Sequence, residues 1–216
     1  MTDESETSLR SAQHPQRFSL SDVEIVSDHL VYKGFYEMRE LVIRHACFSR
    51  PAITIKRELM NRPDAVVVML IDPREDTTIL IEQFRVGAQK APTPWLIECV
   101  AGLIEPNEQP EEVARREALE EAGLTIGRLK WICNYFPSPG GTNEKIFLYV
   151  GEVDASQAGG VHGLAHEGED ILVHRIPLSQ ALNWLQAGHI NNAASIIALQ
   201  WLQLNLVSLK NEWGFS

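Results

Sequence analysis

Three glutamates at positions 117, 120 and 121 constrain this chain more than any other feature of its sequence. In an α-helix, residues three and four apart lie on the same face. Carboxylates gathered in this way repel one another unless a cation lies among them, and all-oxygen ligands suit a hard cation such as Mg²⁺. The segment therefore predicts a helix that carries a metal site for an anionic, phosphate-bearing substrate.

The limits of this helix can be predicted from its flanking residues. Pro110 suits the first helical position, where its missing N–H is not needed, and Gly123 suits the left-handed residue just past the end. Between them, Ala114, Ala118 and Ala122 recur every four residues and form one ridge. Because these side chains are small, we expect the helix to pack close to a sheet.

An acidic helix also has an ordinary explanation, a solvated surface held by salt bridges. Arg116 stands four residues before Glu120 and can pair with it. The fixed frame around these residues favours the metal site instead, because the segment resembles the signature box of the Nudix hydrolases, G-x5-E-x7-R-E-U-x-E-E-x-G-U, where U is a bulky aliphatic residue. Ala118 stands at a U position and departs from the pattern. The matching residues are Gly102, Glu108, Arg116, Glu117, Glu120, Glu121, Gly123 and Leu124.

Composition agrees with an enzyme that has a sizeable core. The chain has 216 residues, 44% of them hydrophobic, and a net charge of −10, which argues against a nucleic-acid partner. No stretch approaches the roughly 20 apolar residues that span a bilayer, so no membrane partner is expected. Cys47, Cys99 and Cys133 form neither a zinc pattern nor an obvious disulfide framework, which indicates a reducing, cytoplasmic location.

The chain divides into three parts. Residues 1–17 are polar and are predicted to be a disordered tail, residues 18–60 alternate in polarity as a small antiparallel sheet would, and residues 61–216 form the main domain. Short strands without a helix can hardly bury themselves, so this sheet needs the main domain or another chain to cover it. Its predicted strands are Val23–Val26, Leu30–Tyr36, Arg39–His45 and Ile53–Arg57.

The main domain alternates strands and helices in an α+β order. Its predicted strands are Ala65–Ile71, Thr78–Phe84, Trp95–Ala101, Leu129–Tyr135, Lys145–Val153 and Ile171–Ile176. Its predicted helices are Pro110–Ala122, Ser179–Ala187 and Ala193–Leu209. The resemblance to the Nudix family implies an α/β/α sandwich, in which helices flank a mixed sheet, with the small N-terminal antiparallel sheet added to it.

The resemblance extends beyond the box. Residues 82–85, 95–102, 138–144 and 192–199 are similar to bacterial ADP-ribose pyrophosphatases, and Pro139 lies 15 residues beyond Leu124, as in that subfamily. This implies Mg²⁺-dependent hydrolysis of the diphosphate of ADP-ribose to AMP and ribose 5-phosphate. Two alternatives are a Nudix hydrolase of another nucleotide sugar, such as GDP-mannose or ADP-glucose, and a non-catalytic sensor of ADP-ribose.

The resemblance also assigns metal ligands and a base. It implies two or three Mg²⁺ ions, or Mn²⁺, and a catalytic carboxylate at Glu167 in the loop that follows residue 160. The alternative is that Glu167 and Glu169 are ordinary surface charges, and the choice between the two as base is open. The implied metal ligands are the carbonyl of Ala101 and the side chains of Glu117, Glu120, Glu121 and Glu169.

Substrate contacts are implied in both parts of the chain. An aromatic pair would stack on adenine and Arg85 would pair with phosphate, although an aromatic residue in a strand can be core and Arg85 can pair with Glu82 or Glu98. In the family the N-terminal sheets are exchanged between subunits, so a homodimer is expected. The implied substrate-binding residues are Phe35, Tyr36, Arg57, Glu58, Arg62, Arg85, Leu103, Ser138, Pro139, Gly140 and Glu144.

Overall fold

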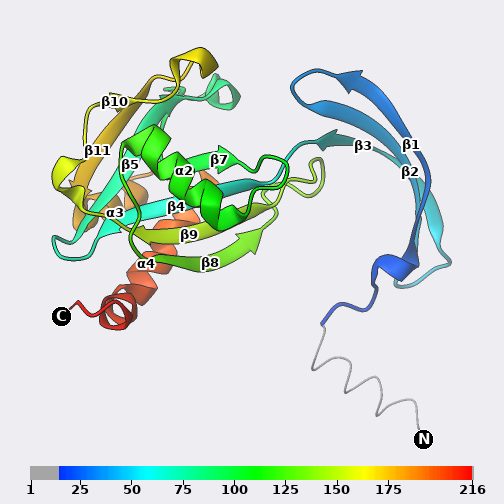
Figure 1. The fold of residues 1–216 in the computed structure, drawn as a ribbon. Helices are drawn as coiled ribbons and strands as arrows, with labels where there is room; N and C mark the ends of the chain where they lie inside the picture. Colours follow the sequence, from blue (N-terminus) through cyan, green and yellow to red (C-terminus); the bar gives the residue numbers. More distant parts are fainter. Residues whose placement is uncertain (1–14, 216) are drawn as a thin grey trace, which may run out of the picture. The chain divides into compact units, whose positions relative to one another are not determined.

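The computed structural model describes residues 15–215, which form two compact units (Figure 1). The first unit comprises the described residues up to Arg62 together with Gly140–Asn143, and the second comprises Pro63–Pro139 with the described residues from Glu144 onward. Most of the predicted tail, residues 1–14, lies outside the described residues.

The first unit is a three-stranded antiparallel sheet in the order β1-β2-β3, preceded by the short 3-10 helix η1. Of the four segments predicted here, the structure joins the first two into one strand, β1, so the sheet has three strands. Register shifts near Ser27 and Tyr32 interrupt the alternation without ending the pairing with β2, as β-bulges do. The elements are η1 (Leu20–Asp22), β1 (Val23–Lys33), β2 (Glu37–His45) and β3 (Ile53–Asn61).

This sheet has no buried core of its own. No residue from 15 to 62 is buried, and large apolar side chains of β1 are open to solvent, such as those of Ile25, Val31 and Tyr32. A three-stranded sheet normally needs a packed apolar face for independent stability. The apolar side chains of β1 are therefore available to a covering surface.

The second unit is built on a mixed sheet of eight strands. The order is β10-β11-β5-β4-β9-β8, with β6 paired to β5 and β7 paired to β4, and β4 runs parallel to β9. The mixed sheet expected for this domain is confirmed. The strands are β4 (Ala65–Asp72), β5 (Thr77–Phe84), β6 (Trp95–Glu98), β7 (Val100–Leu103), β8 (Leu129–Tyr135), β9 (Ile146–Glu152), β10 (Val161–His162) and β11 (Ile171–Pro177).

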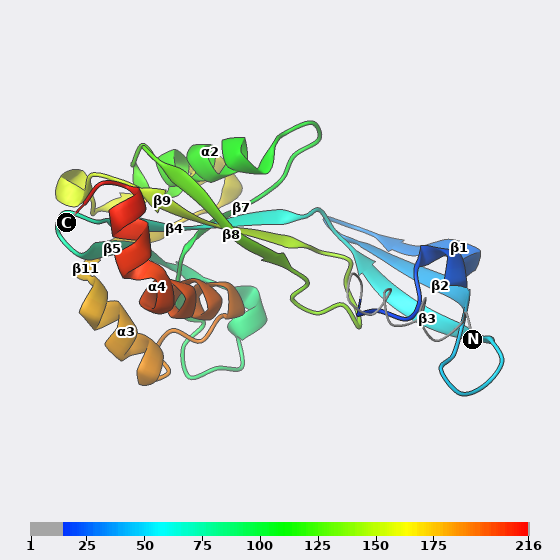
Figure 2. The same cartoon turned by 90° about the horizontal axis from the view of Figure 1, so that it is seen from below.

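Helices cover both faces of this sheet, so the α/β/α sandwich is confirmed. Figure 2 shows α2 on one face, with α3 and α4 on the other. Among residues 15–215, no helix combines the length and the apolar character needed to cross a bilayer. The helices are α2 (Pro110–Ala122), α3 (Leu178–Gln186) and α4 (Ala193–Glu212), with the 3-10 turns η2 (Val86–Ala88), η3 (Ala155–Gln157) and η4 (Ala165–Glu167).

Helix α2 begins and ends where its sequence predicts. Pro110 is its first residue, and Gly123 follows it with a φ of +66°. The N–H of Gly123 donates to the carbonyl of Leu119 at 3.0 Å, which closes the last turn. The ridge of Ala114, Ala118 and Ala122 is buried against the sheet, and these small side chains let the helix approach β4 and β7 closely.

The predicted strand Trp95–Ala101 is wrong in one respect, since it is two strands with a break at Cys99. Strands β4 and β5 pair with each other only over Leu70–Asp72 and Thr77–Ile79, and beyond that point they separate. Strand β6 pairs with β5, and β7 pairs with β4. We call this arrangement, in which residues 95–103 lie between the separated parts of β4 and β5, the fork.

Candidate active site

The three box glutamates lie on the part of α2 that faces the fork. Glu121 is 2% exposed and Glu117 is 9% exposed, whereas Glu120 is only partly buried. The Oε2 atom of Glu121 accepts a hydrogen bond from the backbone N–H of Ala101 at 2.9 Å. The structure therefore brings together the box glutamates and the backbone segment that is implied to supply a carbonyl ligand.

Gly102 makes this close approach possible. A Cβ atom added there would lie 1.7 Å from Oε1 of Glu117, far inside van der Waals contact. The glycine of the box thus leaves the space that the Glu117 carboxylate occupies. Gly102 therefore allows β7 and α2 to pack closely. A glycine in a strand often marks such a close approach.

Arg116 holds the acidic side chains in place. Its Nη1 donates to Glu117 Oε1 at 2.7 Å and to Glu120 Oε2 at 3.1 Å, so the predicted pair with Glu120 is present. Its Nε donates to Glu108 Oε1 at 3.0 Å, and its Nη2 donates to the carbonyl of Leu103 at 3.3 Å. The hydrogen bond from Arg116 lowers the pKa of Glu108, which stays charged as the counterion that orients the guanidinium.

Two of these carboxylates, those of Glu117 and Glu121, are buried with little positive charge around them. Desolvation raises the pKa of Glu117 to about 7, although Arg116 opposes this shift. Desolvation also raises the pKa of Glu121 to about 8, opposed by the N–H of Ala101 and by the charge of Arg85. The charge of Glu169 raises the pKa of both carboxylates, and Glu117 also raises the pKa of Glu121. The site therefore favours the binding of a positive charge, a proton or a cation.

The donors at this site suit a divalent cation. They are carboxylate and carbonyl oxygens, the ligands that Mg²⁺ and Mn²⁺ prefer. Within residues 15–215, no three His, Cys, Asp or Glu side chains are already gathered as a ligand set, and the guanidinium of Arg116 contacts both Glu117 and Glu120. The residues that fit a metal are therefore Glu117, Glu120, Glu121 and the carbonyl of Ala101, after small side-chain movements.

The loop after β10 brings one of its two predicted glutamates near the box. Glu169 is partly buried, its Oε2 accepts the N–H of Leu164 at 2.9 Å, and its charge raises the pKa of both buried box glutamates. Glu167 lies at the end of η4, with its side chain 56% exposed and 3.6 Å from His166. The structure thus places Glu169 in electrostatic contact with the box and Glu167 on the exposed side of the loop.

Three further charged or polar side chains lie at the fork, and one of them, Arg85, acts on the box electrostatically. Arg85 donates from Nε to Glu98 Oε2 at 2.7 Å, which is one of its two predicted partners, and its charge lowers the pKa of Glu121. Gln83 is 7% exposed, and its Nε2 has no hydrogen-bond partner among the described residues. No role was predicted for Gln83, and Glu98 was predicted only as an alternative ion-pair partner of Arg85. Alternation along β5 could have indicated Gln83, because it lies on the same face as Arg85.

Three of the five predicted substrate residues of the first unit, Phe35, Tyr36 and Arg62, form a small aromatic and basic group. The ring of Phe35 is 82% exposed and lies 4.8 Å from that of Tyr36, edge to face. The guanidinium of Arg62 lies over the ring of Tyr36 at 4.7 Å. Arg57 and Glu58 are exposed on β3, and Arg57 donates to the carbonyl of Lys56. The exposure of Phe35 excludes a role in the core of this unit.

The remaining predicted substrate residues lie in loop 136–145 and on β7. Ser138, Pro139 and Gly140 are exposed, whereas Glu144 is buried at 7% exposure. The side chain of Leu103 packs against the core between the sheet and α4. Leu103 therefore contributes its backbone carbonyl rather than its side chain to the contacts of Arg116.

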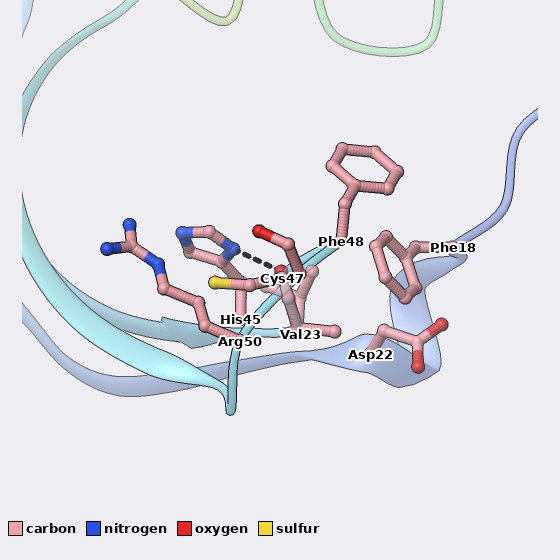
Figure 3. A pocket seen from close by; sticks show the side chains of 9 residues that line it. Phe18, Asp22, Val23, His45, Cys47, Phe48 and Arg50 are labelled. Carbon is pink, nitrogen blue, oxygen red and sulfur yellow. Dashed lines mark hydrogen bonds between the residues drawn. The ribbon is translucent and has the colours of Figure 1, made fainter.

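A cavity of about 590 Å³ lies in the first unit, at the end of the sheet formed by β1 and β2. Figure 3 shows Phe18 and Phe48 on one side of it and Arg50 on the other. The rings of Phe18 and Phe48 are 4.9 Å apart, and His45 Nδ1 is 2.7 Å from the carbonyl of Ala46. None of the residues predicted to bind metal or substrate lines this cavity, so it does not locate the catalytic chemistry.

Comparison with known proteins identifies the class to which this fold and site belong. Residues 60–207 match the NUDIX domain, and the chain belongs to the Nudix family. Nudix hydrolases generally use divalent metal ions, in agreement with the oxygen ligands described above. The family expected from the box is therefore confirmed.

Several similar proteins are named for particular nucleotide substrates. The chain is 48% identical over 208 residues to an ADP-ribose pyrophosphatase of Escherichia coli strain K12, covering 95% of this chain and 100% of that protein. It is 43% identical to an ADP-ribose pyrophosphatase of Haemophilus influenzae, covering 92% and 94%, and 33% identical to a GDP-mannose pyrophosphatase of Enterobacter sp. strain 638, covering 85% and 96%.

A solved structure supports the fold. The crystal structure of an ADP compounds hydrolase superimposes with a TM-score of 0.69, covering 89% of this chain and 98% of that chain. The sequence identity is 24%, so this similarity concerns the fold alone.

The first prediction concerns Gly102. In Gly102→Ala the new methyl group would displace the Glu117 carboxylate, which is the mobile end of a side chain, so the fold survives while the site is altered. We expect catalytic efficiency to fall about 10²-fold, as misplacement of a catalytic group by about 1 Å can cause, with little change in melting temperature. Gly87→Ala is the control, because a Cβ there meets no atom within 4 Å. Equal activity of the two variants would contradict this account.

The second prediction concerns pH and the metal-free protein. The pKa of Glu121 is about 8 in the folded state against an ordinary 4.5, so the folded state holds more protons between these values and stability falls as pH rises through this window. Glu121→Gln removes this buried charge. In EDTA at pH 8 the variant should be more stable than wild type, on the order of 2 kcal/mol, in urea unfolding.

At pH 5 this difference in stability should nearly vanish, because Glu121 is then protonated in the wild type. Glu105→Gln is the matched control, since Glu105 is exposed and lies before the helix. A wild-type free energy of unfolding that is flat from pH 5 to 8 in EDTA would show that the carboxylate is not held as described.

Proposed function

We propose that this protein is a divalent-metal-dependent hydrolase that splits the diphosphate of ADP-ribose into AMP and ribose 5-phosphate. The observation that carries the proposal is the pair of buried carboxylates, Glu117 and Glu121, held against β7 within electrostatic reach of Glu169. Full-length similarity to proteins named ADP-ribose pyrophosphatase supports the choice of substrate.

The residues of this chain would hold two or three Mg²⁺ ions, with Mn²⁺ as an alternative. Glu117 and Glu121 would be the principal ligands, with Glu120, Glu169 and the carbonyl of Ala101 completing the set. When bound, such ions neutralise the diphosphate and make a bound water more acidic. Arg116 would keep its contact with Glu108 and release Glu117 and Glu120, because the bidentate pair with Glu108 fixes its orientation independently of them.

A carboxylate of the loop after β10 would take the proton from the attacking water. Glu167 is the base by resemblance to the family, while Glu169 has the stronger electrostatic contact with the box. Glu167→Gln and Glu169→Gln separate these roles. Loss of the base lowers kcat and removes the acidic limb of the pH–rate profile, whereas loss of a metal ligand raises the Mg²⁺ concentration required for half-maximal rate.

Substrate recognition would use both units. Arg85, oriented by Glu98, would donate to the diphosphate, and Leu103 would lie beside it. The exposed ring of Phe35, with Tyr36, would stack on adenine. The remaining contacts proposed for substrate are Arg57, Glu58, Arg62, Ser138, Pro139, Gly140 and Glu144.

We also propose a homodimer in which the N-terminal sheets are exchanged, so that Phe35 and Arg57 serve the partner's site. The exposed apolar side chains of β1 and the lack of buried residues from 15 to 62 support this proposal, because a second copy would cover them. A cytoplasmic location is proposed as well, supported by the free thiols Cys47, Cys99 and Cys133.

Product release from a panel of ADP-ribose, GDP-mannose, ADP-glucose and NADH tests the function. We expect Mg²⁺-dependent formation of AMP with a clear preference for ADP-ribose, and a loss of about 10³-fold or more in kcat for Glu121→Gln, as for removal of a principal charge-stabilising group. Preference for GDP-mannose would favour the second candidate, to which the Enterobacter relative points. Tight binding of ADP-ribose without turnover would favour a sensor.

Mixing two inactive variants tests the exchanged sheets. Arg57→Ala and Glu121→Gln lie in different units, so an exchanged heterodimer would contain one site with both changes and one site with neither. Unfolding and refolding the mixture should recover about a quarter of wild-type activity, since random assortment makes about half of the dimers mixed. No recovery, with both variants shown to be dimeric by sedimentation, would place each complete site within one chain.

A further inference from the structure

The fork has a weak point at Cys99. This residue belongs to neither β6 nor β7, because β6 ends at Glu98 on β5 and β7 begins at Val100 on β4. Cys99 is 1% exposed, so its backbone N–H is out of reach of solvent. A buried N–H that no strand partner accepts must find another acceptor, or it destabilises the fold.

The first turn of α4 supplies that acceptor. The Oγ atom of Ser195, itself fully buried, accepts the N–H of Cys99 at 2.8 Å. The Nδ2 atom of Asn192 donates to the carbonyl of Ile97 at 2.8 Å, while its Oδ1 accepts the N–H of Ser195 at 3.1 Å and caps the helix. The first turn of α4 is thus bonded to the backbone at the break and two residues before it.

The same backbone segment carries the groups of the active site on its other face. Glu98 holds Arg85, the N–H of Ala101 binds Glu121, and Gly102 lies against Glu117. Core packing shows the same division of faces, since Cys99 packs in the cluster beneath α4 and Val100 in the cluster beneath α2. Residues 98–102 therefore lie between the first turn of α4 and the acidic face of α2.

We propose that Asn192 and Ser195 are positioning residues, which fix the break at Cys99 so that the carbonyl of Ala101 and the carboxylate of Glu98 stay in place for the metal-dependent reaction. This inference rests on the proposed function for the reaction that it serves. Neither residue belongs to the Nudix box, and no role was predicted for either side chain.

The physical reason is the absence of a ladder at the break. Elsewhere in the strand, pairing with β4 or β5 fixes the backbone, but at Cys99 the chain changes partners, and Ser195 accepts the N–H of Cys99 while Asn192 binds the carbonyl of Ile97 two residues earlier. Without Asn192 and Ser195, residues 98–102 can shift along the strand or rotate about its axis. Such a movement displaces the carbonyl of Ala101 and the carboxylate of Glu98 together. Residues that orient ligands in this way affect metal affinity by about 10- to 100-fold when they are removed.

Two variants and one control test this role. Ser195→Ala removes the acceptor of the Cys99 N–H. Asn192→Asp keeps a helix-capping oxygen but has no N–H to donate to Ile97, so it separates helix capping from the contact with β6. Ser208→Ala is the matched control, because Ser208 lies on the same helix, is exposed, and bonds only within the helix, to the carbonyl of Asn205.

Mn²⁺ binding measured by calorimetry without substrate is the primary readout, and hydrogen exchange of backbone amides measured by NMR is the second. We expect Mn²⁺ affinity to fall about tenfold in both variants and not in the control. The amide of Ala101 should lose protection along with that of Cys99. In kinetics, the Mg²⁺ concentration for half-maximal rate should rise similarly, with KM for ADP-ribose at saturating Mg²⁺ changed by less than about twofold.

The inference is overturned if the variants are folded and bind Mn²⁺ like wild type, with only the Cys99 amide less protected, since the contacts would then be structural alone. If Ser195→Ala does not fold, Asn192→Asp decides, because it keeps the cap of α4. A wild-type protein that binds Mn²⁺ but does not hydrolyse ADP-ribose would refute the proposed function, while Mn²⁺ affinity and amide exchange would still decide the role of Ser195.

Discussion

The burial of two carboxylates with too little positive charge around them is the constraint on which this structure depends. Glu117 and Glu121 are nearly inaccessible, and burial raises their pKa values to about 7 and about 8, so the site favours a bound proton or cation. Such a site can exist only if the rest of the fold supplies the stability that it lacks. The alanine ridge of α2 supplies part of it, by packing the helix closely on the sheet.

Around these carboxylates, each arginine is oriented by a glutamate that is more buried than the arginine itself. Glu108 orients Arg116, and Glu98 orients Arg85. The pairs differ in their connection to the fold, because Glu108 lies in the loop before α2 and Glu98 lies at the end of β6. The geometry of the site therefore depends on the fork as much as on the signature helix, and both layers of helices contribute to it.

Local signals allowed the prediction of α2 to the residue, since Pro110 and Gly123 determine its ends through backbone chemistry that does not depend on distant contacts. The break at Cys99 could not be predicted in this way. The run Trp95–Ala101 is apolar apart from Glu98 and contains no turn residue, and the change of strand partner that divides it involves residues far away in sequence. The ion-pair partner of Arg85 could not be predicted from local signals either. The sequence offered Glu82 and Glu98, and the register of the sheet places Glu98 beside Arg85. The roles of Glu167 and of the aromatic pair in the first unit rest on resemblance, because side-chain exposure does not assign a ligand.

The buried position of Cys99 has a consequence for chemical reactivity. Its thiol is held in the core, where burial raises the pKa to about 12, so it is protonated and shielded while the sheet is closed. Alkylating reagents require both access and thiolate, so modification of Cys99 would proceed only through molecules in which β6 and β7 have transiently separated from α4. The half-buried Cys47 and Cys133 have no such requirement. The rate at which Cys99 is alkylated therefore reports how often β6 and β7 separate from α4. Oxidants that attack exposed thiols would not reach Cys99.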